Sequence, residues 1–217
     1  MNIEGLEINS PEYWEIRHKR EPWPRTSGWV LPLIASIIPE KADVLEIGCG
    51  QGAFVNALKQ VRPDIKIKGI DVSPTAIDIA NINYLNTGEV TFQVADVFEL
   101  KKQLKHAYNY IISIQNFEHW PIYTHKEAFH QIWTRLLPGG KFFFTGVGLD
   151  WDLSQMNYSP MEYNEKIIQT PNDFHYNKWS EQNVYDLFIT QKAKSVKFWR
   201  LRGKDRVVAE AEKNAEN

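Results

Sequence analysis

The stretch Val44-Leu-Glu-Ile-Gly-Cys-Gly-Gln-Gly-Ala53 decides the fold of this 217-residue chain. Its first four residues form a short, mostly apolar run that favours a buried strand. Gly48, Gly50 and Gly52 then alternate with other residues before a helical pattern over 53–61. Glycine adopts backbone angles that side chains forbid and lets the backbone pass close to a ligand. A strand, a glycine loop and a helix in this order predict a ligand site at the helix N-terminus.

Strands and helices alternate along the rest of the chain. Ser73-Pro74 is typical of a helix start, since serine caps and proline fits the first turn. The pattern predicts an α/β fold: a doubly wound, mostly parallel seven-stranded sheet with helices on both faces, Rossmann-like, and a C-terminal antiparallel hairpin. The expected strands are 44–47, 65–70, 90–94, 108–114, 141–145, 195–201 and 206–212, and the expected helices are 29–38, 53–61, 73–85, 126–137 and 180–190.

We expect one domain over 1–217, built from four consecutive segments. An N-terminal cap segment (1–40) precedes the ligand-binding core (41–146), and a terminal helix and hairpin (179–217) close the fold. Residues 147–178 show no clear period and predict a substrate lid. The aromatic and methionine side chains there are candidates for an apolar pocket: Trp151, Met156, Tyr158, Met161, Tyr163, Phe174 and Tyr176.

Composition narrows the class of protein. The net charge is −2, which argues against a nucleic-acid partner. No apolar run is long enough to cross a bilayer, and the N-terminus lacks a basic-then-apolar signal, so we expect a cytoplasmic protein without a membrane partner. Cys49 is the one cysteine, which excludes an intramolecular disulfide and a cysteine-pair zinc site. We expect a monomer or a homodimer.

Two cofactors suit the glycine loop. The loop also satisfies the dinucleotide pattern G-x-G-x-x-A through Ala53, and Asp71, about 20 residues further on, could grip the ribose of either cofactor. Glu46 separates the alternatives. A carboxylate beside the loop repels a pyrophosphate but suits a cofactor that carries an ammonium and a sulfonium, as S-adenosylmethionine does.

At this point the chain resembles the class I S-adenosylmethionine-dependent methyltransferases. The resemblance covers about residues 42–146 and consists of five motifs in the family's order. They are Glu46-x-Gly-x-Gly-x-Gly52, Gly69-Ile-Asp71-Val-Ser73, Val94-Ala-Asp96-Val97, the segment from Tyr108 to Glu118-His119, and Leu136-Leu-Pro-Gly-Gly140.

The resemblance implies a cofactor site. It assigns the ribose hydroxyls to Asp71 and the adenine amine to Asp96, and it likens Tyr13-Trp14-x-x-Arg17 to a segment that folds over the cofactor in several small-molecule methyltransferases. The implied cofactor-binding residues are Tyr13, Trp14, Arg17, Glu46, Gly48, Cys49, Gly50, Gly52, Asp71, Val72, Asp96, Val97 and Gln115.

Three departures from family patterns matter. Asn109 stands where an acid is usual, at a mostly structural position. The Asn/Asp-Pro-Pro-Tyr tetrapeptide of the DNA and protein-glutamine methylators is missing after residue 114. Gln115-Asn116 stand where metal-dependent catechol methylators carry acids, so we expect no metal.

The resemblance implies methyl transfer from S-adenosylmethionine to a small organic acceptor by in-line displacement, leaving S-adenosylhomocysteine. The alternatives are a methyltransferase acting on a protein or RNA, and a non-catalytic S-adenosylmethionine-binding protein. His119 is the candidate catalytic base because it follows the fourth strand and an imidazole there could take up a proton near neutral pH. It could equally pack over the cofactor. His125 and His130 also fall near the expected mouth, with His130 the more structural of the two.

Overall fold

The computed structural model describes residues 10–20, 27–84, 87–149, 163–164, 167–169, 175–201 and 206–215, with side chains left undescribed at 163–164, 167–169 and 175–177. Its main sheet has seven strands in the order β3-β2-β1-β4-β5-β10-β9. The strands are β1 Asp43–Ile47, β2 Lys66–Asp71, β3 Val90–Val94, β4 Tyr108–Ile114, β5 Leu136–Val147, β9 Ser195–Trp199 and β10 Arg206–Glu212. β10 runs antiparallel to β5 and to β9, and the remaining neighbours are parallel. The predicted fold class and terminal hairpin are therefore confirmed.

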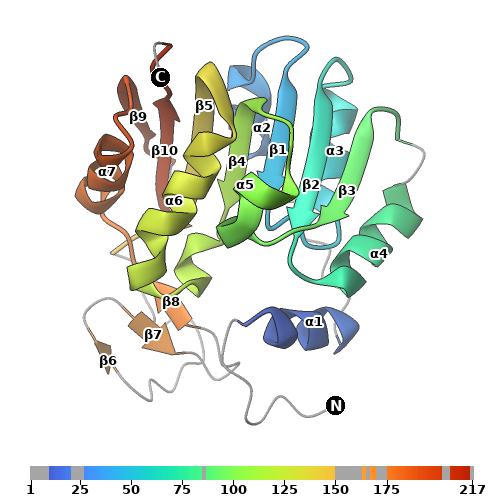
Figure 1. Cartoon of the computed structure of the whole chain (residues 1–217), viewed down its shortest axis with the longest axis horizontal. Coiled ribbons are helices and arrows are strands. Elements are labelled where there is room, and N and C mark those ends of the chain that lie inside the picture. The colour runs from blue at the N-terminus through green and yellow to red at the C-terminus, as the bar shows by residue number, and fades with distance from the viewer. Residues whose placement is uncertain are drawn as a thin grey trace.

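Helices cover both faces of the sheet (Figure 1). α5 Leu100–Gln103, α6 His125–Thr134 and α7 Glu181–Thr190 pack on one face, where Phe142 and Phe144 point. α2 Leu31–Ile37 and α3 Ala53–Val61 pack on the other, where Phe143 points, and α4 Pro74–Tyr84 lies beside β2 and β3. The central strands β1, β4 and β5 thus have two buried faces, as is usual in parallel sheets.

The carboxyl ends of the parallel strands carry the short elements. α1 Pro11–Arg20 crosses this edge next to α4 (Figure 1). Three 3-10 turns follow strands or each other: η1 Val97–Glu99, η2 Phe117–His119 and η3 Ile122–Thr124. Strand order reverses between β1 and β4, so the ligand crevice of this fold class is expected there.

Two expectations were wrong in detail. The helix expected over 126–137 ends at Thr134, because Leu136 pairs with Tyr108 and begins β5 well before the expected residue 141. The segment expected to lack regular structure contains a small antiparallel sheet of β6 Tyr163–Asn164, β7 Ile167–Gln169 and β8 His175–Asn177. The other candidate lid residues, Trp151, Met156, Tyr158, Met161 and Phe174, lie outside the described residues.

Candidate functional site

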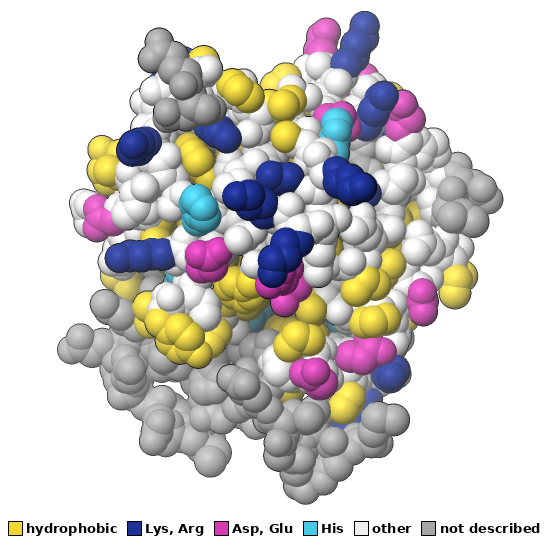
Figure 2. Space-filling view, in the orientation of Figure 1, with side chains coloured by type: hydrophobic (Ala, Val, Ile, Leu, Met, Phe, Trp, Pro, Cys, Tyr) yellow, Lys and Arg dark blue, Asp and Glu magenta, His cyan; other side chains and the backbone are white. Residues whose placement is uncertain are grey.

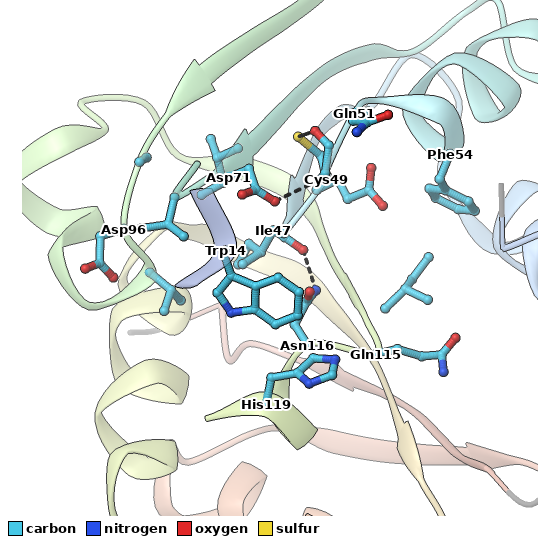
Figure 3. A pocket seen from close by; sticks show the side chains of 18 of the residues that line it. Trp14, Ile47, Cys49, Gln51, Phe54, Asp71, Asp96, Gln115, Asn116 and His119 are labelled. Carbon is cyan, nitrogen blue, oxygen red and sulfur yellow. Dashed lines mark hydrogen bonds between the residues drawn. The ribbon is translucent and has the colours of Figure 1, made fainter. Parts of the chain in front are cut away.

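A cavity of about 260 Å³ opens at the carboxyl ends of β1, β2 and β4. Ten of the thirteen predicted cofactor residues line it: Trp14, Glu46, Gly48, Cys49, Gly50, Asp71, Val72, Asp96, Val97 and Gln115. His119 lines it as well. Figure 3 shows Trp14, Asp71, Asn116 and His119 around the same space. The cavity lies where strand order reverses, which is the binding position of this fold class.

The remaining predicted residues are close by but do not line the cavity. Tyr13 is 1% exposed and packs edge-on against Trp14, with ring centres 5.5 Å apart. Arg17 is partly buried on the same helix. Gly52 begins α3 with a φ of 81°, and a Cβ there would meet the Phe92 ring at 2.7 Å. Gly52 therefore allows close packing between elements rather than direct ligand contact.

Asp71 fixes the glycine loop against the end of β2. Its Oδ2 accepts a hydrogen bond from the Gly50 amide at 2.9 Å (Figure 3), and its Oδ1 accepts one from the Ser73 amide at 3.0 Å. Each carboxylate oxygen keeps a further lone pair for a ligand hydroxyl. Asp96 has a similar local role, since its Oδ1 accepts from the Phe98 amide at 2.9 Å and caps η1.

Glu46 is a buried acid with an unsatisfied oxygen. It is 4% exposed, and its Oε2 has no hydrogen-bond partner among the described residues. Burial first, and the Asp71 charge second, raise the pKa of Glu46 well above 4.5. The same two causes and the Glu46 charge raise the pKa of the Cys49 thiol, so the thiol stays protonated. A cationic ligand group in the cavity would satisfy Glu46 and favour its ionised form.

Asn116 joins the ends of β1 and β4. Its Nδ2 donates to the Ile47 carbonyl at 2.6 Å (Figure 3) and to the Ser113 hydroxyl at 3.2 Å. Gln115 beside it has a φ of 56°, a left-handed conformation uncommon for a non-glycine residue. Its amide is held by the backbone and side-chain oxygens of Thr145. A residue that hydrogen bonds hold in a strained backbone conformation is typical of functional sites.

Aromatic rings and histidines also line the cavity. Trp14 meets His119 edge-on, with ring centres 5.0 Å apart, and Trp120 packs on Phe117 and Phe98. His18, one helical turn after Trp14, also lines the cavity. Burial lowers the pKa of His18 below 6.5 although the Asp71 and Glu15 carboxylates oppose this. An imidazole at His18 is therefore neutral near pH 7.

Sequence reasoning missed several lining residues, including His18, Ser27, Phe54, Asn116 and Trp120. Asn116 and Trp120 fall within the segment after β4 that the strand-end rule marks, and His18 follows Trp14 at helical spacing. His125 and His130 do not line the cavity. The His125 Nε2 contacts the Phe117 and Trp120 carbonyls at 2.9 and 3.0 Å, and burial lowers its pKa to about 4. Both its contacts are structural.

Asn109, the position at which the chain departs from the family's usual acid, also has a structural contact. Its side-chain oxygen accepts from the Asp43 amide at 3.0 Å, at the start of β1. Among the described residues, no group of three or more His, Cys, Asp or Glu side chains is placed to hold a metal ion. Every helix within the same ranges is too short or too polar to span a bilayer.

Comparison with known proteins decides the family. Residues 44–140 match the model of a methyltransferase domain. A malonyl-[acyl-carrier protein] O-methyltransferase from Ilyobacter polytropus is 30% identical over 133 residues, which cover 58% of this chain and 48% of that protein. A release factor glutamine methyltransferase from Buchnera aphidicola is 36% identical over 113 residues, covering 49% and 40%. Residues 44–140 therefore form a class I S-adenosylmethionine-dependent methyltransferase domain.

The fold agrees with this assignment over nearly the whole chain. Human N-acetylserotonin methyltransferase, solved in complex with S-adenosylmethionine, superposes with a TM-score of 0.70 at 18% identity, covering 99% of this chain and 60% of that one. The match of residues 44–140 to a methyltransferase domain favours S-adenosylmethionine over the dinucleotide interpretation of the glycine loop. Because the match spans less than half of each curated relative's length, those relatives do not decide what this methyltransferase acts on.

Proposed function

We propose that this methyltransferase transfers a methyl group from S-adenosylmethionine to a small organic acceptor. One observation carries the proposal: a single cavity joins the buried acids Glu46 and Asp71, and the half-buried Asp96, to aromatic side chains that include Trp14 and Trp120. The acids suit the polar and cationic groups of the cofactor, and the aromatic side chains suit an apolar acceptor. A cytoplasmic location and a monomeric or homodimeric state belong to the same proposal.

The cofactor fits the residues present. The unsatisfied Glu46 oxygen would receive its ammonium, Asp71 its ribose hydroxyls and Asp96 its adenine amine, with Val72, Val97, Cys49 and Gln115 as further contacts. When bound, S-adenosylmethionine supplies a methyl group already activated by the sulfonium. The protein then has to align the acceptor and exclude water, and Trp14 and Trp120, which line the cavity, would serve both purposes.

An acceptor hydroxyl or amine also needs a proton acceptor, and we assign this role to His119. It lines the cavity directly after β4 and meets the Trp14 ring edge-on. His119→Ala is expected to lower turnover by about 10²–10⁴-fold, the usual contribution of a general base. The matched control is His130→Ala, since His130 is exposed on α6 away from the cavity. Turnover within roughly threefold of the unmodified protein would show that His119 is not the base.

A protein or RNA acceptor is the competing proposal, and the 36% identity to a release factor glutamine methyltransferase is the observation in its favour. Against it, Gln115-Asn116-Phe117-Glu118 follows β4 in place of the tetrapeptide of the amino-methylating enzymes. Figure 2 shows Lys/Arg and Asp/Glu side chains interspersed over the face it draws, a surface of mixed charge. A long basic stripe would be typical of a nucleic-acid partner.

Calorimetry and a panel of acceptors test the proposal together. We expect S-adenosylmethionine to bind, NAD to give no heat of binding, and mass spectrometry to find S-adenosylhomocysteine only when a small aromatic hydroxyl, amine or thiol is present. Methyl incorporation into protein or RNA fractions alone would favour the competing acceptor class. Tight cofactor binding with no transfer to any acceptor would favour a non-catalytic S-adenosylmethionine-binding protein.

A further inference from the structure

Glu15 has an unusual set of contacts for a residue near the surface of α1. Its Oε2 accepts hydrogen bonds from the Ser73 hydroxyl at 2.6 Å and the Thr75 amide at 3.0 Å, and its Oε1 accepts one from the Thr75 hydroxyl at 2.6 Å. Lys19 adds an ion pair at 3.0 Å. Ser73 and Thr75 lie 58 and 60 residues further along the chain, at the start of α4. One carboxylate therefore joins two helices that are distant in sequence.

The contacts are those of a helix cap supplied from outside the helix. The first amides of a helix have no partner within it, and negative charge is favoured there. Burial alone would raise the pKa of Glu15, but the hydrogen bonds from Ser73 and Thr75 and the Lys19 contact lower it to about 2. The pKa of Glu15 in the folded protein lies below the ordinary 4.5. The stability that these bonds contribute is therefore fully present above pH 4.5 and is lost as the pH falls toward 2.

The helix that Glu15 holds carries part of the cavity wall. Pro11, Trp14 and His18 of α1 line the cavity. Trp14 contacts His119, and the His18 ring lies 3.6 Å from where a Cβ on Gly50 would be. Glu15 follows Trp14 directly and precedes His18 by three residues, so its attachment to α4 sets the position of both rings.

Ser73 connects this attachment to Asp71, the acid that we propose holds the ribose hydroxyls. Ser73 is fully buried, its hydroxyl donates to Glu15 and accepts from the Ala76 amide at 3.1 Å, and its own amide donates to Asp71 Oδ1 at 3.0 Å. A shift of α1 would withdraw the Glu15 oxygen from the same residue that orients Asp71. The position of α1 and the geometry of Asp71 are thus linked through one buried serine.

We propose that Glu15 is a positioning residue for cofactor binding: by fastening α1 to the start of α4 it holds Trp14 and His18 over the cofactor and Asp71 in its binding orientation. This rests on the proposed function, because it takes the cavity to be the S-adenosylmethionine site. Since Glu15 acts before the chemical step, its loss weakens cofactor affinity and speeds cofactor release while turnover at saturating cofactor changes little.

Glu15→Gln tests this in the full chain, because glutamine keeps the size but loses the charge and one acceptor oxygen. We expect the Kd and KM for S-adenosylmethionine to rise about tenfold or more, the loss typical of hydrogen bonds to a charged group, with kcat within about twofold. Hydrogen exchange of the α1 amides should accelerate, while that of the α3 amides stays the same. Glu12→Gln, an exposed acid on the same helix, is the control and should change neither quantity.

Thr75→Val keeps the shape of Thr75 and removes one donor, so it is the milder second variant. It should raise the Kd less than Glu15→Gln, and the two changes together should be less than additive because they break one shared bond. Unchanged affinity in both variants overturns the proposal, and so does faster α1 exchange with unchanged affinity. If the unmodified protein itself binds no S-adenosylmethionine, the proposed function fails, whereas α1 exchange still reports whether Glu15 fastens the helix.

Discussion

Replacing Gly48 with alanine is expected to cost far more stability and activity than replacing Gly139, although both glycines have left-handed backbone. Their φ angles are 68° and 72°. A side chain in this conformation costs about 1–2 kcal/mol at either position. The two sites differ in what a Cβ would meet. At Gly139 the space within 4 Å is open, whereas at Gly48 the Cβ would lie 2.7 Å from the Asn116 Nδ2 and closer still to its Oδ1.

Asn116 has little room to move away. Its amide is held by the Ile47 carbonyl and the Ser113 hydroxyl at the carboxyl ends of β1 and β4. Either the asparagine gives up these bonds or the glycine loop shifts, which adds about 1–3 kcal/mol of overpacking cost at Gly48. A loop shift also moves the Gly50 amide from Asp71, so cofactor geometry suffers. A displacement of about 1 Å at such a site lowers turnover about a hundredfold.

Urea unfolding and methyl-transfer rates measure the two parts of this prediction. Gly139→Ala should lose only the stability that the left-handed backbone costs and should keep its activity. Gly48→Ala should lose more stability and also lose activity. Adding Asn116→Ala to Gly48→Ala removes the obstructing amide, so part of the stability should return in the double variant. Equal losses at Gly48 and Gly139 would contradict the argument, since they would leave nothing for the Asn116 contact to explain.

The core of the fold could be predicted because its local signals agree with its packing. Val90–Val94, Tyr108–Ile114 and Ala53–Val61 have the predicted bounds, and each joins an apolar pattern to a clear end signal. Ser180 caps α7 as expected, with its hydroxyl accepting from the Asn183 amide. Where a distant partner decides the structure, the prediction fails. Leu136 continues a helical pattern in sequence, but pairing with Tyr108 makes it part of β5.

The same distinction holds for the candidate site. Strand ends place Glu46, Asp71 and Asp96 around one cavity, and the glycine spacing and strand order imply that arrangement. Helical spacing puts Trp14 and His18 on one face of α1, but spacing alone does not show that this face meets the cavity. Which side chains of α1 face the cavity depends on the attachment of Glu15 to Ser73 and Thr75, about 60 residues away. Trp14 and His18 therefore line the cavity, whereas Tyr13 is buried beside it.

Glu46→Gln is expected to weaken S-adenosylmethionine binding without weakening the fold. In the ligand-free protein, Glu46 is buried beside Asp71 and its Oε2 lacks a partner among the described residues, so its charge is unfavourable. Glutamine has nearly the same shape and no charge. The pKa of Glu46 in the folded protein is raised above 4.5. Ionisation of Glu46 therefore lowers the stability of the protein as the pH rises from 4.5 toward that raised pKa. The variant should be as stable as the unmodified protein below pH 4.5 and more stable at neutral pH.

Binding should respond in the opposite direction. The ammonium of the cofactor pairs with the ionised carboxylate, and removing one partner of a buried charge pair costs about 2 kcal/mol or more, roughly thirtyfold in Kd. 5′-Methylthioadenosine lacks the ammonium and provides the matched control ligand. Its affinity should be the same for both proteins. Weaker binding of both ligands would instead indicate that glutamine disturbs the glycine loop.

The pH dependence of binding gives an independent check on the same residue. A cation stabilises ionised Glu46, so binding lowers its raised pKa and releases a proton. The affinity of the unmodified protein for S-adenosylmethionine should therefore rise as the pH increases from 4.5 toward the raised pKa of Glu46, by up to tenfold per pH unit while Glu46 is still protonated in the free protein. Calorimetry in buffers of different ionisation enthalpy measures the released proton directly. Glu46→Gln should lose both the proton release and the slope, and a slope that persists in the variant would assign the titration to another group in the cavity, such as His18.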